Sequence, residues 1–121
     1  MPNQQSRRVH RGDIIRVDFE PVEGSEQGST RPALVISPEI INRGDVIVVA
    51  PITSKNTERI YPWEALLDEG DGGLSVPSKV LFRHIRGIST SRITGSYGSV
   101  ASETLDHIEE SLKIAVGLEK V

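Results

Sequence analysis

Short apolar segments, separated by polar and glycine-containing stretches, make up most of the chain and predict a mainly β protein. The first of them, Asp13–Phe19, alternates in part and is rich in β-branched residues. Arg31–Ser37 is also expected to be a strand, because its proline stands near the start, where a missing N–H costs least. Val46–Pro51 is continuously apolar, which is typical of a strand that is buried on both faces.

The apolar segments stay short in the second half of the chain, and further strands are expected there. They are Ile60–Leu67, weakened by Pro62, then one or two strands within Leu74–Ile88, with Val80, Phe82 and Ile85 as core candidates, and finally Gly95–Val100. Polar connections are expected at Pro21–Thr30, Pro38–Asp45 (with room for a helical turn), Ser54–Glu58 and Asp68–Gly73. Short strands with turns at near-regular spacing favour a small barrel over a βαβ sheet.

The period of the apolar residues changes at the C-terminus and predicts a helix there. One helical face would carry Leu105, Ile108, Leu112 and Val116. We further expect Ser102 as the N-terminal cap, an ion pair between Glu109 and Lys113, and a stop at Gly117. The predicted fold class is therefore mainly β with a C-terminal helix (α+β), the helix packing on a small barrel.

The length of 121 residues fits one domain over residues 1–121, with residues 1–9 expected to be a disordered tail. The absence of cysteine excludes disulfides and thiolate metal sites. No apolar run approaches the ~20 residues that a membrane helix needs. Since the N-terminus also has no apolar signal segment, we expect a cytoplasmic protein without membrane contact.

The charge balance is slightly acidic and uneven along the chain. Lysine and arginine total 14 against 17 acidic residues, for a net charge of -3. This argues against a protein that coats nucleic acid nonspecifically, but it leaves room for a local basic groove. The basic residues gather in two segments, with Arg7, Arg8, His10, Arg11 and Arg16 in one and Arg83, His84, Arg86 and Arg92 in the other. Each cluster, taken alone, is equally compatible with a solvated patch that has no role.

The histidines and the glycine-rich loop do not predict a metal or cofactor site. His10, His84 and His107 lack the paired spacing of metal ligands. Gly24–Gly28 lacks the lysine and the following helix of a phosphate-binding loop. We therefore expect no metal and no cofactor.

The order of residues in the first half of the chain is more informative than its composition. Residues 12–37 read GDIIRVDFEPVEGSEQGSTRPALVIS, and residues 48–54 read VVAPITS. These blocks resemble the MazF/PemK toxins, in which a GDI strand precedes P-x-x-GSEQ, a short gap, RPALV and a later strand that ends in Pro-x-Thr-Ser. With Leu74–Arg86 and the C-terminal helix, the resemblance extends from Gly12 to Leu118. It departs at residues 83–86, which read Arg-His-Ile-Arg where the family often has Asp-Gln-Ile-Arg.

The resemblance implies a specific fold and reaction. The family fold is a small SH3-like barrel of the PemK type with a C-terminal helix, and its members are usually homodimers with an RNA groove near the dimer interface. They are toxins of type II toxin–antitoxin systems, each held in check by a cognate antitoxin protein. They cut single-stranded RNA, including messenger RNA, at short sequence motifs without a metal. The products carry a 2′,3′-cyclic phosphate and a 5′-hydroxyl.

The resemblance also assigns roles to particular residues. It carries the catalytic roles onto Arg31 and Thr53, with Glu26 as a candidate proton acceptor. A guanidinium matches phosphate geometry, and a threonine hydroxyl adds a donor, so both suit the charge that develops when a 2′-hydroxyl attacks phosphorus. The residues expected to bind RNA are Gly24, Ser25, Gln27, Ser54, Arg83 and Arg86.

Other interpretations of these residues remain. Glu26 would otherwise be a solvated loop carboxylate, Arg31 an ion pair at a strand edge, and Thr53 a hydroxyl that completes a turn. A different function is also open, since a related barrel family poisons DNA gyrase through its C-terminal residues. This chain ends in Gly117-Leu118-Glu119-Lys120-Val121, without an aromatic anchor. The alternative to RNA cleavage is therefore a non-catalytic protein poison on the same fold.

Overall fold

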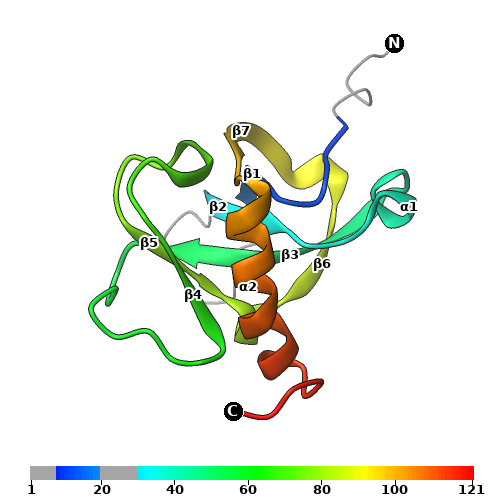
Figure 1. The fold of residues 1–121 in the computed structure, drawn as a ribbon. Coiled ribbons are helices and arrows are strands. Elements are labelled where there is room, and N and C mark those ends of the chain that lie inside the picture. Colours follow the sequence, from blue (N-terminus) through cyan, green and yellow to red (C-terminus); the bar gives the residue numbers. More distant parts are fainter. Residues whose placement is uncertain (1–7, 20–29) are drawn as a thin grey trace, which may run out of the picture.

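The structure, a computed structural model, describes residues 8–19 and 30–121, and antiparallel strands dominate it (Figure 1). The strands are β1 (Asp13–Asp18), β2 (Thr30–Val35), β3 (Val46–Thr53), β4 (Glu64–Leu67), β5 (Ser78–Leu81), β6 (Arg86–Ser89) and β7 (Ile93–Ser99). The α-helices are α1 (Glu39–Asn42) and α2 (Ser102–Ala115), and the 3₁₀ turns are η2 (Asp71–Gly73), η3 (Phe82–His84) and η4 (Thr90–Arg92).

Strand β3 is the centre of the sheet. The hydrogen-bonded order is β4-β5-β3-β2-β1-β7, and β6 pairs with the first half of β3 while β5 pairs with its end. The sheet curls, and α2 runs across one side of it (Figure 1). The predicted mainly β fold with a C-terminal helix is confirmed. Within the described residues the path ends at β4 and β7, and β6 pairs with β3 alone, so the hydrogen-bonded order does not close into a ring.

Strand β3 is buried on both faces from Val49 to Ile52, which explains most of its continuous apolar run. Ala50 and Ile52 belong to a first core cluster, which also contains Ile108 of α2. Ile47 and Val49 belong to a second core cluster on the opposite face. Because successive residues of a strand point to opposite faces, a strand between two clusters must be apolar at nearly every position.

Several strand boundaries differ from the prediction. The strand expected over Ile60–Leu67 begins only at Glu64, because the residues around Pro62 form a turn in which the Glu64 N–H donates to the Tyr61 carbonyl at 2.8 Å. The segment Leu74–Ile88 contains two strands, β5 and β6, separated by η3. His84, expected in a strand, therefore lies in a 3₁₀ turn.

The start of α2 does not use the predicted cap or ion pair. Ala101 occupies the N-cap position without a side-chain hydrogen bond, and Ser102 is already helical, so the prediction of Ser102 as the cap is wrong. Glu109 pairs with Arg11 at 2.8 Å rather than with Lys113. The long-range partner is available because α2 packs beside the segment that precedes β1.

The end of α2 confirms Gly117 as the stop. Gly117 has φ 82, and the N–H of Leu118 donates to the Lys113 carbonyl at 2.8 Å, as in a Schellman termination. Val116 was expected on the packed face but is 52% exposed, because the helix ends one residue before it. Ala115 packs against the first core cluster instead.

The N-terminal segment is partly packed. Val9, expected within a disordered tail, is 3% exposed and belongs to the second core cluster. Residues 1–7 lie outside the described residues. The neighbouring His10 Nδ1 lies 2.6 Å from Glu39 of α1.

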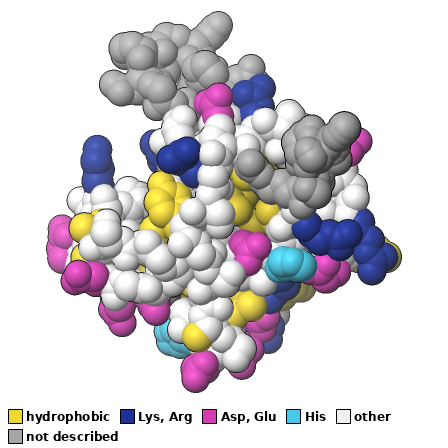
Figure 2. All heavy atoms as spheres, turned by 90° about the horizontal axis from the view of Figure 1, so that it is seen from above, with side chains coloured by type: hydrophobic (Ala, Val, Ile, Leu, Met, Phe, Trp, Pro, Cys, Tyr) yellow, Lys and Arg dark blue, Asp and Glu magenta, His cyan; other side chains and the backbone are white. Residues whose placement is uncertain are grey.

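On the surface, basic and acidic side chains are interspersed around apolar ones on the face that Figure 2 shows. None of the helices in the described part of the chain is long and apolar enough to cross a membrane.

Candidate functional site

The register between β2 and β3 brings Arg31 and Thr53 together. The antiparallel pairing sets Ala33 opposite Pro51. Beyond this pair the two strands take other partners, Arg31 pairing with Val17 of β1 and Thr53 with Lys79 of β5. Two residues far apart in the sequence thus come to the same end of the central strand, where both line one cavity.

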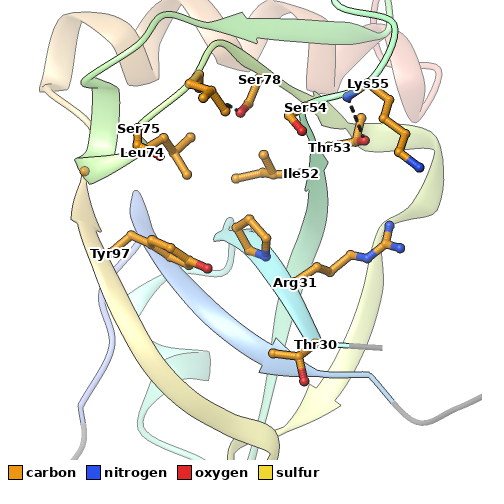
Figure 3. Close-up of a pocket in the computed structure, with 13 residues that line it drawn as sticks. Thr30, Arg31, Ile52, Thr53, Ser54, Lys55, Leu74, Ser75, Ser78 and Tyr97 are labelled. Atoms are coloured by element: carbon orange, nitrogen blue, oxygen red, sulfur yellow. Dashed lines mark hydrogen bonds between the residues drawn. The ribbon is translucent and has the colours of Figure 1, made fainter. Parts of the chain in front are cut away.

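Both residues line one open cavity of about 440 Å³ (Figure 3). Its walls come from β2, the end of β3, the segment after η2, the start of β5, and β7. The lining residues are Thr30, Arg31, Pro32, Ile52, Thr53, Ser54, Lys55, Gly73, Leu74, Ser75, Val76, Ser78 and Tyr97. The cavity therefore joins a basic and hydroxyl-bearing side to an apolar side.

The Thr53 hydroxyl is held in place by a backbone group. Its Oγ1 accepts a hydrogen bond from the Lys55 N–H at 3.1 Å, and the side chain is half-buried. This contact satisfies the turn after β3, as the alternative interpretation of Thr53 supposed. Because the oxygen acts only as the acceptor in this bond, its O–H remains able to donate to a ligand.

Arg31 has no partner for its guanidinium among the described residues. Its side chain is exposed, and among residues 8–19 and 30–121 it makes no ion pair or hydrogen bond through its guanidinium. A strand-edge ion pair, the alternative interpretation of Arg31, is thus not formed with any described residue. Figure 3 shows Arg31, Thr53 and Lys55 on the same side of the cavity.

A second cavity, of about 450 Å³, adjoins the first, because Thr53 and Lys55 line both. Lys79, 5% exposed, is neutralised there by Glu64, with 2.9 Å between Nζ and Oε1, and its Nζ also donates to the Arg59 carbonyl at 3.0 Å. Since this ammonium is already paired, Lys55 and Arg59 are the basic residues of the second cavity that make no ion pair with a described residue.

Comparison with known proteins identifies the family. Residues 10–116 match the family described as PemK-like, MazF-like toxin of type II toxin-antitoxin system. The chain belongs to this family.

Similar proteins agree with this assignment in sequence and in fold. Endoribonuclease MazF9 of Mycobacterium tuberculosis is 38% identical over 117 residues, covering 91% of this chain and 98% of the relative. Endoribonuclease EndoA of Bacillus subtilis is 36% identical over 111 residues, covering 91% of this chain and 96% of the relative. A crystal structure of MazE-MazF from Deinococcus radiodurans is similar with a TM-score of 0.73 at 29% identity, covering 92% of this chain and 97% of that one.

Of the other residues predicted to act in this MazF-like toxin, some lie in the cavity and some lie outside it or outside the described residues. Ser54 is exposed and lines the cavity beside Thr53. Gly24, Ser25, Glu26 and Gln27 lie outside the described residues.

Arg83 and Arg86 are not in the cavity of Arg31 and Thr53. Arg83 lines a separate pocket with Trp63 and the C-terminal end of α2. The Arg86 guanidinium carbon lies 5.2 Å from the centre of the Phe19 ring. The structure therefore does not gather these two arginines with the catalytic pair, and their RNA-binding role stays a prediction.

The cavity also contains residues that the sequence reasoning missed. Lys55 follows the Pro-x-Thr-Ser block directly, and its charge next to that block was a usable signal. Tyr97 comes from β7, far along the chain, and no local pattern ties it to Thr53. No group of three or more metal-ligating side chains is found within the described ranges.

Proposed function

We propose that this chain is the toxin of a type II toxin–antitoxin system and a sequence-selective, metal-independent endoribonuclease that cuts single-stranded RNA. The observation that carries the proposal is the meeting of Arg31 and Thr53 in one open cavity, within a chain of the MazF-like family. Two relatives that align over nearly their whole length are endoribonucleases. The gyrase-poison alternative is not favoured, because the family match and these relatives point to RNA cleavage.

The reaction is an attack by a ribose 2′-hydroxyl on the adjacent phosphorus. A new bond forms between the 2′-oxygen and phosphorus, the bond to the 5′-oxygen breaks, and the 5′-oxygen takes up a proton. The products are a 2′,3′-cyclic phosphate and a 5′-hydroxyl. Negative charge develops on the non-bridging oxygens, so donors already in place lower the barrier most.

Arg31 and Thr53 would supply these donors. The Arg31 guanidinium offers a planar set of N–H groups that matches two phosphate oxygens. The Thr53 hydroxyl adds a donor whose position is fixed by the Lys55 N–H. Lys55 adds a positive charge at the same wall. An arginine stays protonated in proteins, so Arg31 acts electrostatically rather than as a base.

The proton of the 2′-hydroxyl needs an acceptor. The described lining residues include no carboxylate and no imidazole. Glu26 precedes Thr30, a lining residue, by four positions in the chain, a span of at most about 14 Å, so the chain length permits its carboxylate to reach the cavity. We assign the general-base role to Glu26 on this ground.

The proposed partners follow from the same cavity. The substrate is single-stranded RNA, chiefly messenger RNA, so the toxin would act in the cytoplasm and arrest translation and growth. The cognate antitoxin would occupy the cavity with an acidic segment, because carboxylates can pair with Arg31 and Lys55 as phosphates do. The similar MazF of Deinococcus radiodurans has a crystal structure together with MazE.

The proposal is tested by incubating the purified protein with a long defined RNA in EDTA, followed by mapping of cleavage sites and end-group analysis. We expect cuts at one short motif, with cyclic phosphate and 5′-hydroxyl ends, and we expect saturating antitoxin to suppress them. Arg31→Ala should lower single-turnover cleavage by about 100-fold or more, and Arg31→Lys should also be impaired.

Arg43→Ala is the matched control, because Arg43 is exposed after α1 and lines none of the cavities described above. It removes the same charge away from the site, so near-normal cleavage is expected. Intact RNA with the native protein, or near-normal cleavage by a folded Arg31→Ala variant, would refute the proposal.

A further inference from the structure

We propose that Tyr97 is a specificity-determining residue that stacks on one nucleobase of the RNA next to the cleaved phosphate. The inference rests on the proposed function, because it takes Arg31 and Thr53 as the phosphate-binding side of the cavity. Its ligand is an unpaired base of a single-stranded RNA, held on the apolar side of the same cavity.

The cavity has two chemically different sides. Arg31, Thr53 and Lys55 lie together on one side, and Tyr97 projects from β7 on the other, with its ring turned inward (Figure 3). Leu74, 6% exposed, and Ile52, 2% exposed, form an apolar floor between them. A nucleotide has this same division, with a charged phosphate at one end and a flat, weakly polar base at the other.

Tyr97 differs from every other aromatic residue of the chain. Phe19 and Phe82 are buried, and Tyr61 stacks on Trp63 with 5.1 Å between ring centres. Tyr97 is 39% exposed and has no ring or cation partner among the described residues. Its ring therefore remains available to a ligand, and exposed aromatic rings are what proteins use to bind unstacked bases.

The backbone of Tyr97 is held by an unusually close contact. A Cβ added at Gly73 would lie 1.9 Å from the Tyr97 carbonyl oxygen, and one added at Gly98 would lie 2.9 Å from the Gly72 carbonyl oxygen. Only glycines allow η2 to approach β7 so closely. The run of glycines after Asp71, which the sequence indicates only as a turn, thus anchors the strand position from which Tyr97 enters the cavity.

A ring carried by a fixed backbone lowers the cost of ordering the base. This ring and the donors of Arg31 and Thr53 would together bind the base and the phosphate of one nucleotide step. The base beside the cut would then contribute to the choice of cleavage motif through the quality of its stacking.

The test compares Tyr97→Phe, Tyr97→Leu and Tyr97→Ala in RNA binding and cleavage. Binding is measured with an RNA that carries a 2′-deoxy nucleotide at the mapped site, which cannot be cut. We expect Tyr97→Phe to bind like the native protein, and Tyr97→Leu and Tyr97→Ala to bind about tenfold more weakly. The loss should appear in KM more than in kcat, since Tyr97 does not touch the reacting atoms.

Abasic substitutions identify the stacked base. Each base that flanks the cut is removed in turn, and the affinity of the native protein is compared with that of Tyr97→Ala. At one position the loss of binding free energy from the abasic site and the loss from Tyr97→Ala should not add, because both changes remove the same stacking contact. Val116→Ala, at an exposed site just after α2 and outside the described cavities, is the control and should bind normally.

Several outcomes would overturn the inference. One is that Tyr97→Leu binds RNA as tightly as the native protein. Another is that the affinity losses from the abasic site and from Tyr97→Ala add fully at every flanking position. A third is that the Tyr97 variants lose affinity for the antitoxin alone, which would make the apolar side a protein-binding pocket. If Tyr97→Ala fails to fold, the abasic comparison with Tyr97→Leu still decides. If the native protein cuts no RNA, the proposed function fails; if it cuts and the Tyr97 variants bind normally, only this inference fails.

Discussion

At the scale of single residues, Arg31 and Thr53 differ from ordinary surface residues by their position rather than by their type. Thr53 ends the central strand, and a backbone N–H holds its oxygen. Arg31 sits at the start of β2 without a described partner. A donor that is already in place costs no reorganisation when charge develops, and this is why such residues can carry a large part of catalysis.

Replacement of Thr53 separates the hydroxyl from the rest of the side chain. Thr53→Ala should lower single-turnover cleavage on the order of 100-fold, because one donor to the phosphate is lost. Thr53→Ser keeps the hydroxyl and should retain cleavage within about tenfold. Thermal melts should show a change of about 1 kcal/mol or less for either variant, since Thr53 is not a core residue. Equal cleavage by Thr53→Ala and the native protein would remove Thr53 from the mechanism.

At the scale of elements, the contact between η2 and β7 links the glycine turn to the cavity wall. Gly73 has φ 85, and its Cα faces the Tyr97 carbonyl. The turn that carries it is short, so the close contact depends on a backbone conformation that only glycine adopts without strain. The position of Tyr97 thus depends on an element outside its own strand.

Substitution of two glycines of this turn measures that contact. Gly70 has φ 95, and no atom lies within 4 Å of a Cβ added there. Gly70→Ala should therefore lower the free energy of unfolding by roughly 1 kcal/mol, through the strained backbone conformation alone. Gly73→Ala adds a clash with backbone and should cost roughly 2–3 kcal/mol or more. Denaturant unfolding of both variants provides the comparison. Equal losses of stability would mean that η2 does not need to approach β7.

At the scale of the whole molecule, several large apolar side chains are exposed to solvent. Ile40 of α1 is 73% exposed and Val46 at the start of β3 is 56% exposed. Large apolar side chains left in water favour association with a partner surface.

We expect the chain to be a homodimer, as the family resemblance implies. Sedimentation at micromolar concentration should give the mass of two chains, and Val46→Glu should shift the distribution towards monomer if β3 lies in the interface. A purely monomeric native protein under the same conditions would contradict the homodimer. A dimer unaffected by Val46→Glu would place the interface elsewhere.

The sequence by itself determined the strand-rich class, the C-terminal helix, its stop at Gly117 and the motif blocks that mark Arg31 and Thr53. These features depend on local periodicity, on turn chemistry and on the order of neighbouring residues, all of which are present in the chain before it folds. The two-sided burial of β3 was also predictable, since only a strand between two apolar layers is apolar throughout.

The tertiary structure alone decided which distant residues meet. It brought Arg31, Thr53 and Tyr97 to one cavity, paired Arg11 with Glu109, and buried Val9. It also places Arg83 in a pocket separate from the cavity of Arg31 and Thr53. Strand register and the packing of α2 create these contacts between segments far apart in the chain, so the free energy that selects them depends on the whole fold and has no local signature.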